Sequence, residues 1–374
     1  MPTPPLRVVV APDKFKGTLT GAEAAAAIAD GVRRVVPDAV VTTVPLADGG
    51  EGTVDAVLAS GGRERVVRVP GPDGRPVSAR FALTRGTAVL EAAQACGLQL
   101  LTPTAQTAVT AHSVGVGELV RAALAAGATR VVVGLGGVAS TDGGAGMASA
   151  LGARLLDSSG ARLPPGGGAL ADLAEVNLEL LQEVVARATF VAATDVTNPL
   201  LGPDGAAAVY APQKGAGPEQ VAQLERGLTR WADLVEASFG NRTRDVPGAG
   251  AAGGLGWGLT TLLGAEVRPG ADLVMELLGV EQALARADLV VTGEGRMDRQ
   301  TTFGKGPVAL ARAAKARGVP VLAIAGAVED EVRHLDVFAG LWSLVDTMGE
   351  DAALHDAGRA LTETTATAVR ALLR

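Results

Sequence analysis

Short, largely apolar runs alternate with glycine-rich polar loops and with amphipathic stretches along most of this chain. Runs of this kind, bounded by Gly, Pro or Asp, are typical of buried strands. They are Leu6–Ala11, Ala39–Pro45, Arg130–Val133, Phe190–Ala193, Leu289–Thr292, Val319–Ala325 and Leu341–Val345. Helical periodicity follows several of them, and one helix start carries a capping box at Thr20 and Glu23. The alternation predicts an α/β protein with a doubly wound sheet.

The hydrophobic pattern changes near Arg65. From there to Glu91, short alternating segments are separated by turns at 71–74 and 86, which is typical of antiparallel strands. The doubly wound pattern returns in the carboxyl-terminal part of the chain. We therefore predict a discontinuous lobe made of residues 1–64 and 281–374, with a mixed α/β lobe of residues 65–280 inserted into it.

Length, charge and the scarcity of cysteine and histidine narrow the function classes. A chain of 374 residues is long enough for two cores, and a net charge of -7 argues against nucleic acid or an acidic membrane as a partner. One cysteine allows no disulfide within the chain, and three scattered histidines leave acid–base chemistry to carboxylates. The amino-terminal sequence has no signal-peptide pattern and no apolar run reaches membrane-spanning length, so we expect a cytoplasmic protein.

Loops that follow the predicted strands concentrate acids, cations and glycines. The candidate acids are Asp13, Asp48, Glu51, Asp142, Asp195, Glu294 and Asp298, and the candidate cations are Lys14, Lys16, Lys214, Arg296 and Lys305. The loop at 134–146 interleaves hydroxyls and an acid with glycines, so its backbone N–H groups could surround a phosphate. Taken singly, each acid could equally be a turn or capping residue, and the lysines could lie in solvated loops.

Familiar nucleotide-binding motifs do not fit these loops. The sequence Gly293–Asp298 lacks the third glycine of the dinucleotide fingerprint, which disfavours a nicotinamide oxidoreductase. Lys305 is followed by Gly306 rather than by the Ser or Thr of a P-loop, and no nucleophile elbow is present. What remains is oxygen ligands for Mg²⁺ together with cations and N–H groups for phosphate. That set suits phosphoryl transfer or, more broadly, an anion-binding α/β protein.

Seven segments, in this order, resemble the bacterial glycerate kinases of the glycerate 2-kinase type. They are 11–16 (APDKFK), 47–53 (ADGGEGT), 136–147 (GGVASTDGGAGM), 195–200 (DVTNPL), 212–216 (PQKGA), 247–254 (PGAGAAGG) and 292–298 (TGEGRMD). Each would be weak alone, but seven in one order are specific. The resemblance implies two α/β lobes, one of them flavodoxin-like with a parallel sheet, and an active site in the cleft between them. It also implies transfer of the ATP γ-phosphate to D-glycerate, giving 2-phosphoglycerate and ADP with the help of Mg²⁺.

The resemblance does not assign individual roles, so we assign the residues of the acceptor site, which lie in four of these loops, as hypotheses. Asp195, which follows a predicted strand, is the predicted base that orients the glycerate 2-hydroxyl. Lys14 and Arg296 are the predicted catalytic cations, because the glycerate carboxylate needs a cationic partner. The predicted substrate-binding residues are Lys16, Asp48, Glu294 and Asp298.

ATP and its metal ion are assigned to the remaining loops. The predicted nucleotide-binding residues are Gly136, Gly137, Ser140, Thr141 and Lys214. Asp298 and Asp142 are the predicted ligands of Mg²⁺, with Glu294 and Asp48 as alternatives. Two other functions stay open, namely a kinase of the same fold for another small hydroxy acid and a non-catalytic sensor of glycerate or nucleotide. Neither a nucleic acid nor a membrane is an expected partner, and a homo-oligomer is possible.

Overall fold

The computed structural model describes residues 4–374 except 16, 45, 47–48, 241 and 303–305, and only the backbone of Gln300 and Thr302. The chain divides into two compact units. The first unit is Met1–Asp48 with Ala271–Arg374, and the second unit is Gly49–Gly270. The second unit is thus inserted into the first, with divisions at 48/49 and 270/271 where the sequence pattern placed them at 64/65 and 280/281.

Two short helices account for this difference in the divisions. Helix α2 (Thr53–Ala59) packs against β4 and β5 of the second unit, whose bounds are given below. Helix α11 (Gly270–Leu277) carries Met275 into a core of the first unit, beside Val280 and Leu284. The change of hydrophobic pattern near Arg65 therefore marks the antiparallel strands within the second unit. It does not mark where the second unit begins.

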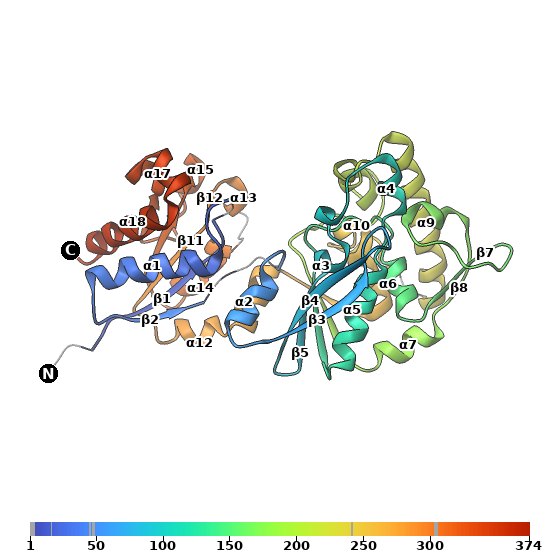
Figure 1. The fold of residues 1–374 in the computed structure, drawn as a ribbon, viewed down its shortest axis with the longest axis horizontal. Helices are drawn as coiled ribbons and strands as arrows, with labels where there is room; N and C mark the ends of the chain where they lie inside the picture. Colours follow the sequence, from blue (N-terminus) through green and yellow to red (C-terminus); the bar gives the residue numbers. More distant parts are fainter. Residues whose placement is uncertain (1–3, 16, 45, 47–48, 241, 303–305) are drawn as a thin grey trace. The chain divides into compact units, whose positions relative to one another are not determined.

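The first unit is built on a five-stranded parallel sheet (Figure 1). Its strands are β1 (Arg7–Pro12), β2 (Val40–Thr43), β11 (Leu289–Gly293), β13 (Val321–Ala325) and β15 (Gly340–Ser343). They lie in the order β2-β1-β11-β13-β15, with every neighbouring pair parallel. Counted within this unit, the order is 2-1-3-4-5, the flavodoxin-like order, so the predicted parallel sheet is confirmed. Its topological switch point lies between β1 and β11.

Helices cover both faces of this sheet because successive strand residues point to opposite sides. Val8 and Val10 of β1 face one core, and Val9 and Ala11 face the other. Helices α1 (Gly21–Val35) and α18 (Ala357–Leu372) cover the first face, and α12 (Val280–Leu284) and α14 (Gly306–Lys315) cover the second. The shorter elements are β12 (Arg296–Met297), α13 (Arg299–Thr302), β14 (Ala327–Val328), α15 (Asp330–Arg333), α16 (Leu344–Met348) and α17 (Glu350–His355). The predicted capping box of α1 is present, since Thr20 accepts from the Glu23 N–H and Glu23 accepts from the Thr20 N–H.

The second unit contains a mixed six-stranded sheet in the order β10-β9-β6-β5-β4-β3. Its strands are β3 (Arg63–Pro70), β4 (Pro76–Thr84), β5 (Thr87–Glu91), β6 (Arg130–Gly134), β9 (Thr189–Ala193) and β10 (Glu266–Arg268). The pairs β3–β4 and β4–β5 are antiparallel, whereas β5, β6, β9 and β10 are parallel to one another. Four carboxyl ends therefore meet at one edge of the sheet. The predicted mixed α/β lobe is confirmed.

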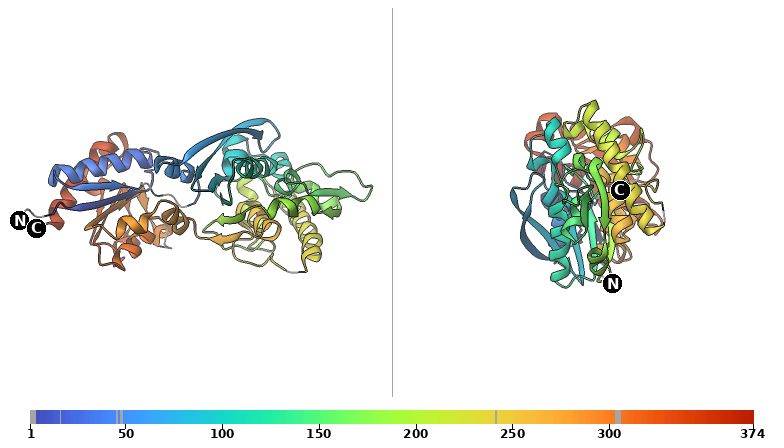
Figure 2. Two further views of the ribbon diagram at one scale, coloured as in Figure 1. Left: turned by 90° about the horizontal axis from the view of Figure 1, so that it is seen from below. Right: turned by 90° about the vertical axis from the view of Figure 1, so that its right-hand side faces the viewer.

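Helices and one projecting hairpin complete the second unit. Besides α2, its helices are α3 (Ala92–Cys96), α4 (Ala105–Thr110), α5 (Val114–Ala125), α6 (Ala145–Ala150), α7 (Glu179–Val185), α8 (Ala206–Tyr210), α9 (Pro218–Phe239) and α10 (Ala251–Leu263), with 3-10 turns at Leu98–Leu100, Gly167–Asp172 and Pro212–Lys214. Buried Trp231 and Trp257 meet edge to face with ring centroids 5.8 Å apart. The hairpin of β7 (Arg154–Asp157) and β8 (Leu173–Asn177) projects from this unit (Figure 2). Among the described residues, no helix is both long and apolar enough to cross a membrane.

Candidate active-site loops

In the first unit, the loops after β1 and β11 lie side by side at the topological switch point. The Asp13 N–H donates to the Gly293 carbonyl at 2.8 Å, and the Lys14 N–H donates to Asp13 Oδ1 at 2.6 Å. Gly293 must be a glycine here, because a Cβ would lie 1.9 Å from the Ile324 carbonyl oxygen of β13. Open α/β sheets bind ligands at this position, outside the carboxyl ends of the strands. The predicted residues Asp13 and Lys14 are therefore beside the predicted 292–298 loop.

Thr301 ties together the two acids of the loop after β11. Its hydroxyl donates to Glu294 Oε1 at 2.9 Å and accepts from the Asp298 N–H at 3.2 Å. Thr301 is buried, whereas Glu294 and Asp298 are half-buried. A buried hydroxyl thus fixes the loop so that both acids occupy one short segment.

Arg296, between these two acids, is engaged by another carboxylate. Its side chain is exposed, and its Nε donates to Glu329 Oε1 at 3.1 Å. The pairing of β12 with β14 brings the two residues together, because Glu329 follows β14 directly. This ion pair raises the pKa of Arg296. A substrate carboxylate at Arg296 would have to share the guanidinium with Glu329.

In the second unit, glycines allow three loops to pack closely against one another at the carboxyl ends of the parallel strands. A Cβ on Gly134 would lie 2.1 Å from the Gly49 carbonyl oxygen, and one on Gly49 would lie 2.6 Å from Gly270 Cα. Asp195, exposed just after β9, joins this stack because its Oδ1 accepts from the Gly270 N–H at 3.2 Å. The segments beginning at 49, 134 and 194 therefore meet at one edge, as the parallel strands require.

Glu91 is a buried anchor of this edge that sequence reasoning missed. It ends β5 with 4% exposure, and its Oε1 accepts from the N–H groups of Gly52 at 3.0 Å and Val54 at 2.8 Å. Gln94 Nε2 donates to the other carboxylate oxygen at 3.3 Å. Burial raises the pKa of the Glu91 carboxyl, and the N–H donors oppose that rise. The available signal was a single acid at the end of an otherwise apolar strand.

Asp142, inside the glycine-rich loop after β6, is fully buried and satisfied by local donors. Its Oδ2 accepts from the Ser113 N–H and hydroxyl, both at 2.8 Å, and from the Gly146 N–H at 3.1 Å. Its Oδ1 accepts from the Gly144 N–H at 3.3 Å. A carboxylate with four such donors holds the loop against the start of α5. Its predicted role as a Mg²⁺ ligand stays a prediction.

Lys214 lies beneath the same loop. It is 3% exposed, and its Nζ donates to the Ser140 carbonyl at 2.6 Å and lies 3.4 Å from Thr141 Oγ1. Gly253, whose φ is +68°, must be a glycine here, because a Cβ would lie 2.1 Å from the Ser140 carbonyl oxygen. Burial lowers the pKa of Lys214 to about 8. The Ser140 hydroxyl is also buried, and it has no hydrogen-bond partner among the described residues.

The model of the glycerate kinase family matches residues 8–373. The chain belongs to the glycerate kinase family. It is 46% identical to a glycerate kinase of Bacillus subtilis (strain 168) over 86% of this chain and 85% of that protein. It is 40% identical to glycerate 2-kinase of Escherichia coli (strain K12) over 92% of each chain. The crystal structure of a provisionally named glycerate kinase 2 from Salmonella typhimurium LT2 matches with a TM-score of 0.90 at 40% identity, covering 99% of this chain and 98% of that one.

Family membership confirms the sequence-based assignment to the glycerate kinases, and with it the assignment to an enzyme. The structure separates the predicted nucleotide residues of this family member by depth. Gly136 and Gly137 are exposed, whereas Ser140, Thr141 and Lys214 are buried. Only the outer part of the loop is therefore accessible to a ligand, and the role of these residues in nucleotide binding stays a prediction.

Three of the predicted site residues are not described by the structure. Lys16, Asp48 and Lys305 lie outside the described residues.

Among the residues that the structure describes, no group of three or more His, Cys, Asp or Glu side chains is placed to hold a metal ion. Kinases commonly bind Mg²⁺ through one or two carboxylates plus the substrate phosphates. The pair Glu294 and Asp298, held on one loop by Thr301, fits that kind of site.

Proposed function

We propose that this chain transfers the γ-phosphoryl group of ATP to the 2-hydroxyl of D-glycerate, giving 2-phosphoglycerate and ADP. The observation that carries the proposal is the 40% identity to glycerate 2-kinase of Escherichia coli over 92% of both chains. A kinase for another hydroxy acid and a non-catalytic sensor are not favoured, because the similar proteins of Bacillus subtilis and Escherichia coli are named as glycerate kinases. The cytoplasmic location expected from the sequence stays part of this proposal.

The first unit supports the anion- and metal-binding part of this proposal. Lys14 and Arg296 follow the two strands that flank the topological switch point, where a small anionic substrate would bind. Arg296 is proposed to bind the glycerate carboxylate while it shares its guanidinium with Glu329. Glu294 and Asp298 are the residues that would hold Mg²⁺ or the glycerate hydroxyls. When bound, Mg²⁺ would neutralise charge on the phosphates during transfer.

A residue of the second unit supports the part of the proposal that concerns the general base. Asp195 is exposed, and the Gly270 N–H fixes the direction of its carboxylate through Oδ1. A carboxylate held in this way can orient a hydroxyl and accept its proton as the oxygen attacks phosphorus. Asp195 is therefore our proposed base.

The glycine-rich loop after β6 supports the phosphate-binding part. Its outer residues Gly136 and Gly137 are exposed, so their backbone can approach a ligand closely. Lys214 holds the loop from beneath through the Ser140 carbonyl, and the charge of its ammonium group would favour an anion above the loop. We propose that Lys214 acts through the loop rather than by touching phosphate.

The test uses ADP release with ATP, Mg²⁺ and D-glycerate, compared with other small hydroxy acids and with no acceptor. Asp195→Asn should lower kcat by about 10²–10⁴-fold, the usual contribution of a positioned acid or base, with folding intact. Asp172→Asn, which changes another exposed acid of the same unit, is the matched control and should behave as wild type. Near-wild-type turnover of Asp195→Asn would remove Asp195 from the mechanism. A higher kcat/KM for another hydroxy acid, or no ADP with any acceptor, would contradict the proposed substrate or the proposed catalysis.

A further inference from the structure

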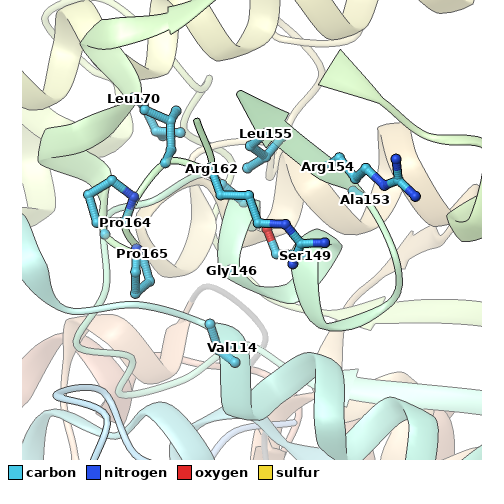
Figure 3. A pocket seen from close by; sticks show the side chains of 13 residues that line it. Val114, Gly146, Ser149, Ala153, Arg154, Leu155, Arg162, Pro164, Pro165 and Leu170 are labelled. Carbon is cyan, nitrogen blue, oxygen red and sulfur yellow. The ribbon is translucent and has the colours of Figure 1, made fainter. Parts of the chain in front are cut away.

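The second unit carries a pocket whose lining residues include none of those to which a role in the reaction is assigned above. It lies between α6, strand β7 and the segment 162–166, it has a cavity volume of about 180 Å³, and it opens to solvent (Figure 3). This volume is below the roughly 300–1,000 Å³ of most small-molecule pockets, so the pocket can hold a small compound or one part of a larger one. Asp195, Glu91 and the exposed Gly136 and Gly137 of the glycine-rich loop after β6 are not among its lining residues. The pocket is therefore a distinct feature of this unit.

One side of the pocket is apolar and largely rigid. Leu170, at 2% exposure, lies on the same side of the pocket as Pro164 and Pro165 (Figure 3), and Leu155, at 8% exposure, also lines it. Proline rings and buried leucines lose little entropy when a ligand covers them. This wall suits the apolar body of a small molecule.

The other side carries two arginines and a hydroxyl. Arg154 and Arg162 belong to paired segments, because Leu156 bridges to Arg162 in antiparallel register. Alternate residues share a face, so this register makes the two arginines diagonal neighbours on one face. In Figure 3 both side chains extend in the same direction, with the Arg162 guanidinium beside Ser149. Both arginines are exposed, and neither has an acidic partner within 4 Å among the described residues.

We propose that this pocket binds a small organic anion, a carboxylate or a phosphate ester with an apolar body. Guanidinium groups form charge-assisted and often bidentate hydrogen bonds with these two anions. The Ser149 hydroxyl can add one further hydrogen bond. The apolar wall opposite the two arginines selects anions that carry a hydrophobic group over inorganic ions.

The wall of this pocket is also connected to the glycine-rich loop after β6. Gly146 lines the pocket, and its N–H donates to buried Asp142. Val114 lines it as well, and it follows Ser113, whose N–H and hydroxyl both donate to Asp142. A ligand that presses on Gly146 or Val114 therefore acts on the carboxylate that holds the loop after β6. Occupancy of the pocket should change the KM for ATP.

Binding is tested directly with 8-anilinonaphthalene-1-sulfonate, an apolar ring system with one anionic group, by fluorescence titration. The double variant Arg154→Gln/Arg162→Gln should bind it about tenfold or more weakly, since a lost charge-assisted hydrogen bond reaches that size. Both side chains are exposed, so the variant should fold. Arg187→Gln, which removes an exposed arginine of the same unit away from the pocket, is the matched control and should bind as wild type. Equal affinity in all three proteins would overturn the site.

Three competitors with one ring each define the ligand. Benzoate and phenyl phosphate should displace the fluorescent probe, and their ranking distinguishes a carboxylate from a phosphate site. Benzyl alcohol, which is neutral, should displace it far less, and equal displacement would overturn the preference for anions. The KM for ATP should shift when the better anion saturates the pocket, and this shift should vanish in the double variant. A shift that persists in the double variant, or no shift in wild type, would overturn the connection to the loop.

Discussion

Two substitutions of Glu91 distinguish its role as a hydrogen-bond acceptor for the segment at Gly52 and Val54 from the effect of its negative charge. Glu91→Ala removes the acceptor of two N–H groups, those of Gly52 and Val54. A buried unsatisfied donor costs about 1–3 kcal/mol, so the free energy of unfolding should fall by roughly 2–4 kcal/mol, because water can reach half-buried Gly52 in part. The loosened loop should also raise the KM for at least one substrate.

Glu91→Gln keeps an acceptor oxygen of the same shape but removes the charge. We expect a change of stability within about 1 kcal/mol, because weaker hydrogen bonds are offset by the absence of a buried charge. The raised pKa of Glu91 has a further consequence. The folded state binds this proton more tightly than the unfolded state, so the stability it contributes is present below the unfolded pKa and is lost as pH rises through the folded pKa. The glutamine variant has no such proton to release, so its stability should not fall as the pH rises through this range.

The assay is urea unfolding followed by tryptophan fluorescence in a Trp342→Phe background. Trp231 and Trp257 are both buried in the second unit, so the signal then reports on that unit alone. Steady-state kinetics of the same variants give KM and kcat. An alanine variant as stable and as active as wild type would refute the anchoring role. A glutamine variant as damaged as the alanine variant would show that the charge, not the acceptor, holds the loop.

Two further predictions concern buried polar groups next to the loops. The folded pKa of Lys214, about 8, is below its usual 10.5, so the unfolded state binds the proton more tightly. The free energy of unfolding should therefore rise between pH 8 and 10.5, by up to about 3 kcal/mol. Lys214→Met should abolish that rise in urea unfolding, and an unchanged rise would contradict the assignment of the shifted pKa to Lys214. Thr301→Val should cost about 1–2 kcal/mol and raise the Mg²⁺ concentration needed for half-maximal activity, because Glu294 and Asp298 lose their common partner. Thr301→Ser should restore both properties, and a valine variant with wild-type Mg²⁺ dependence would show that Thr301 does not position these acids.

The parallel sheet and the family could be predicted from the sequence because both depend on local patterns. Apolar runs such as Leu289–Thr292 are buried strands whichever strands they join, and the box at Thr20 and Glu23 closes within one helical turn. The division of the chain was less predictable. The contacts that place α2 in the second unit are made with β4 and β5, which both begin well after the helix ends and belong to the antiparallel part of the sheet.

The depth of each polar residue could not be predicted, because it depends on distant partners. Asp142 and Asp195 both follow strands in glycine- or threonine-containing loops, yet Asp142 is buried by Ser113 from another segment and Asp195 is exposed. Glu91 finds its donors 37 and 39 residues earlier in the chain. No spacing rule connects such groups, so a structure is needed to distinguish the anchors from the exposed acids.

Phosphorus NMR of the reaction products tests the central proposal most directly. The protein is incubated with ATP, Mg²⁺ and D-glycerate, and the phosphate ester formed is compared with authentic 2-phosphoglycerate and 3-phosphoglycerate. We predict ADP together with 2-phosphoglycerate, in equal amounts and absent from a sample without glycerate. A resonance of 3-phosphoglycerate instead, or consumption of ATP without any phosphorylated glycerate, would contradict the proposed reaction.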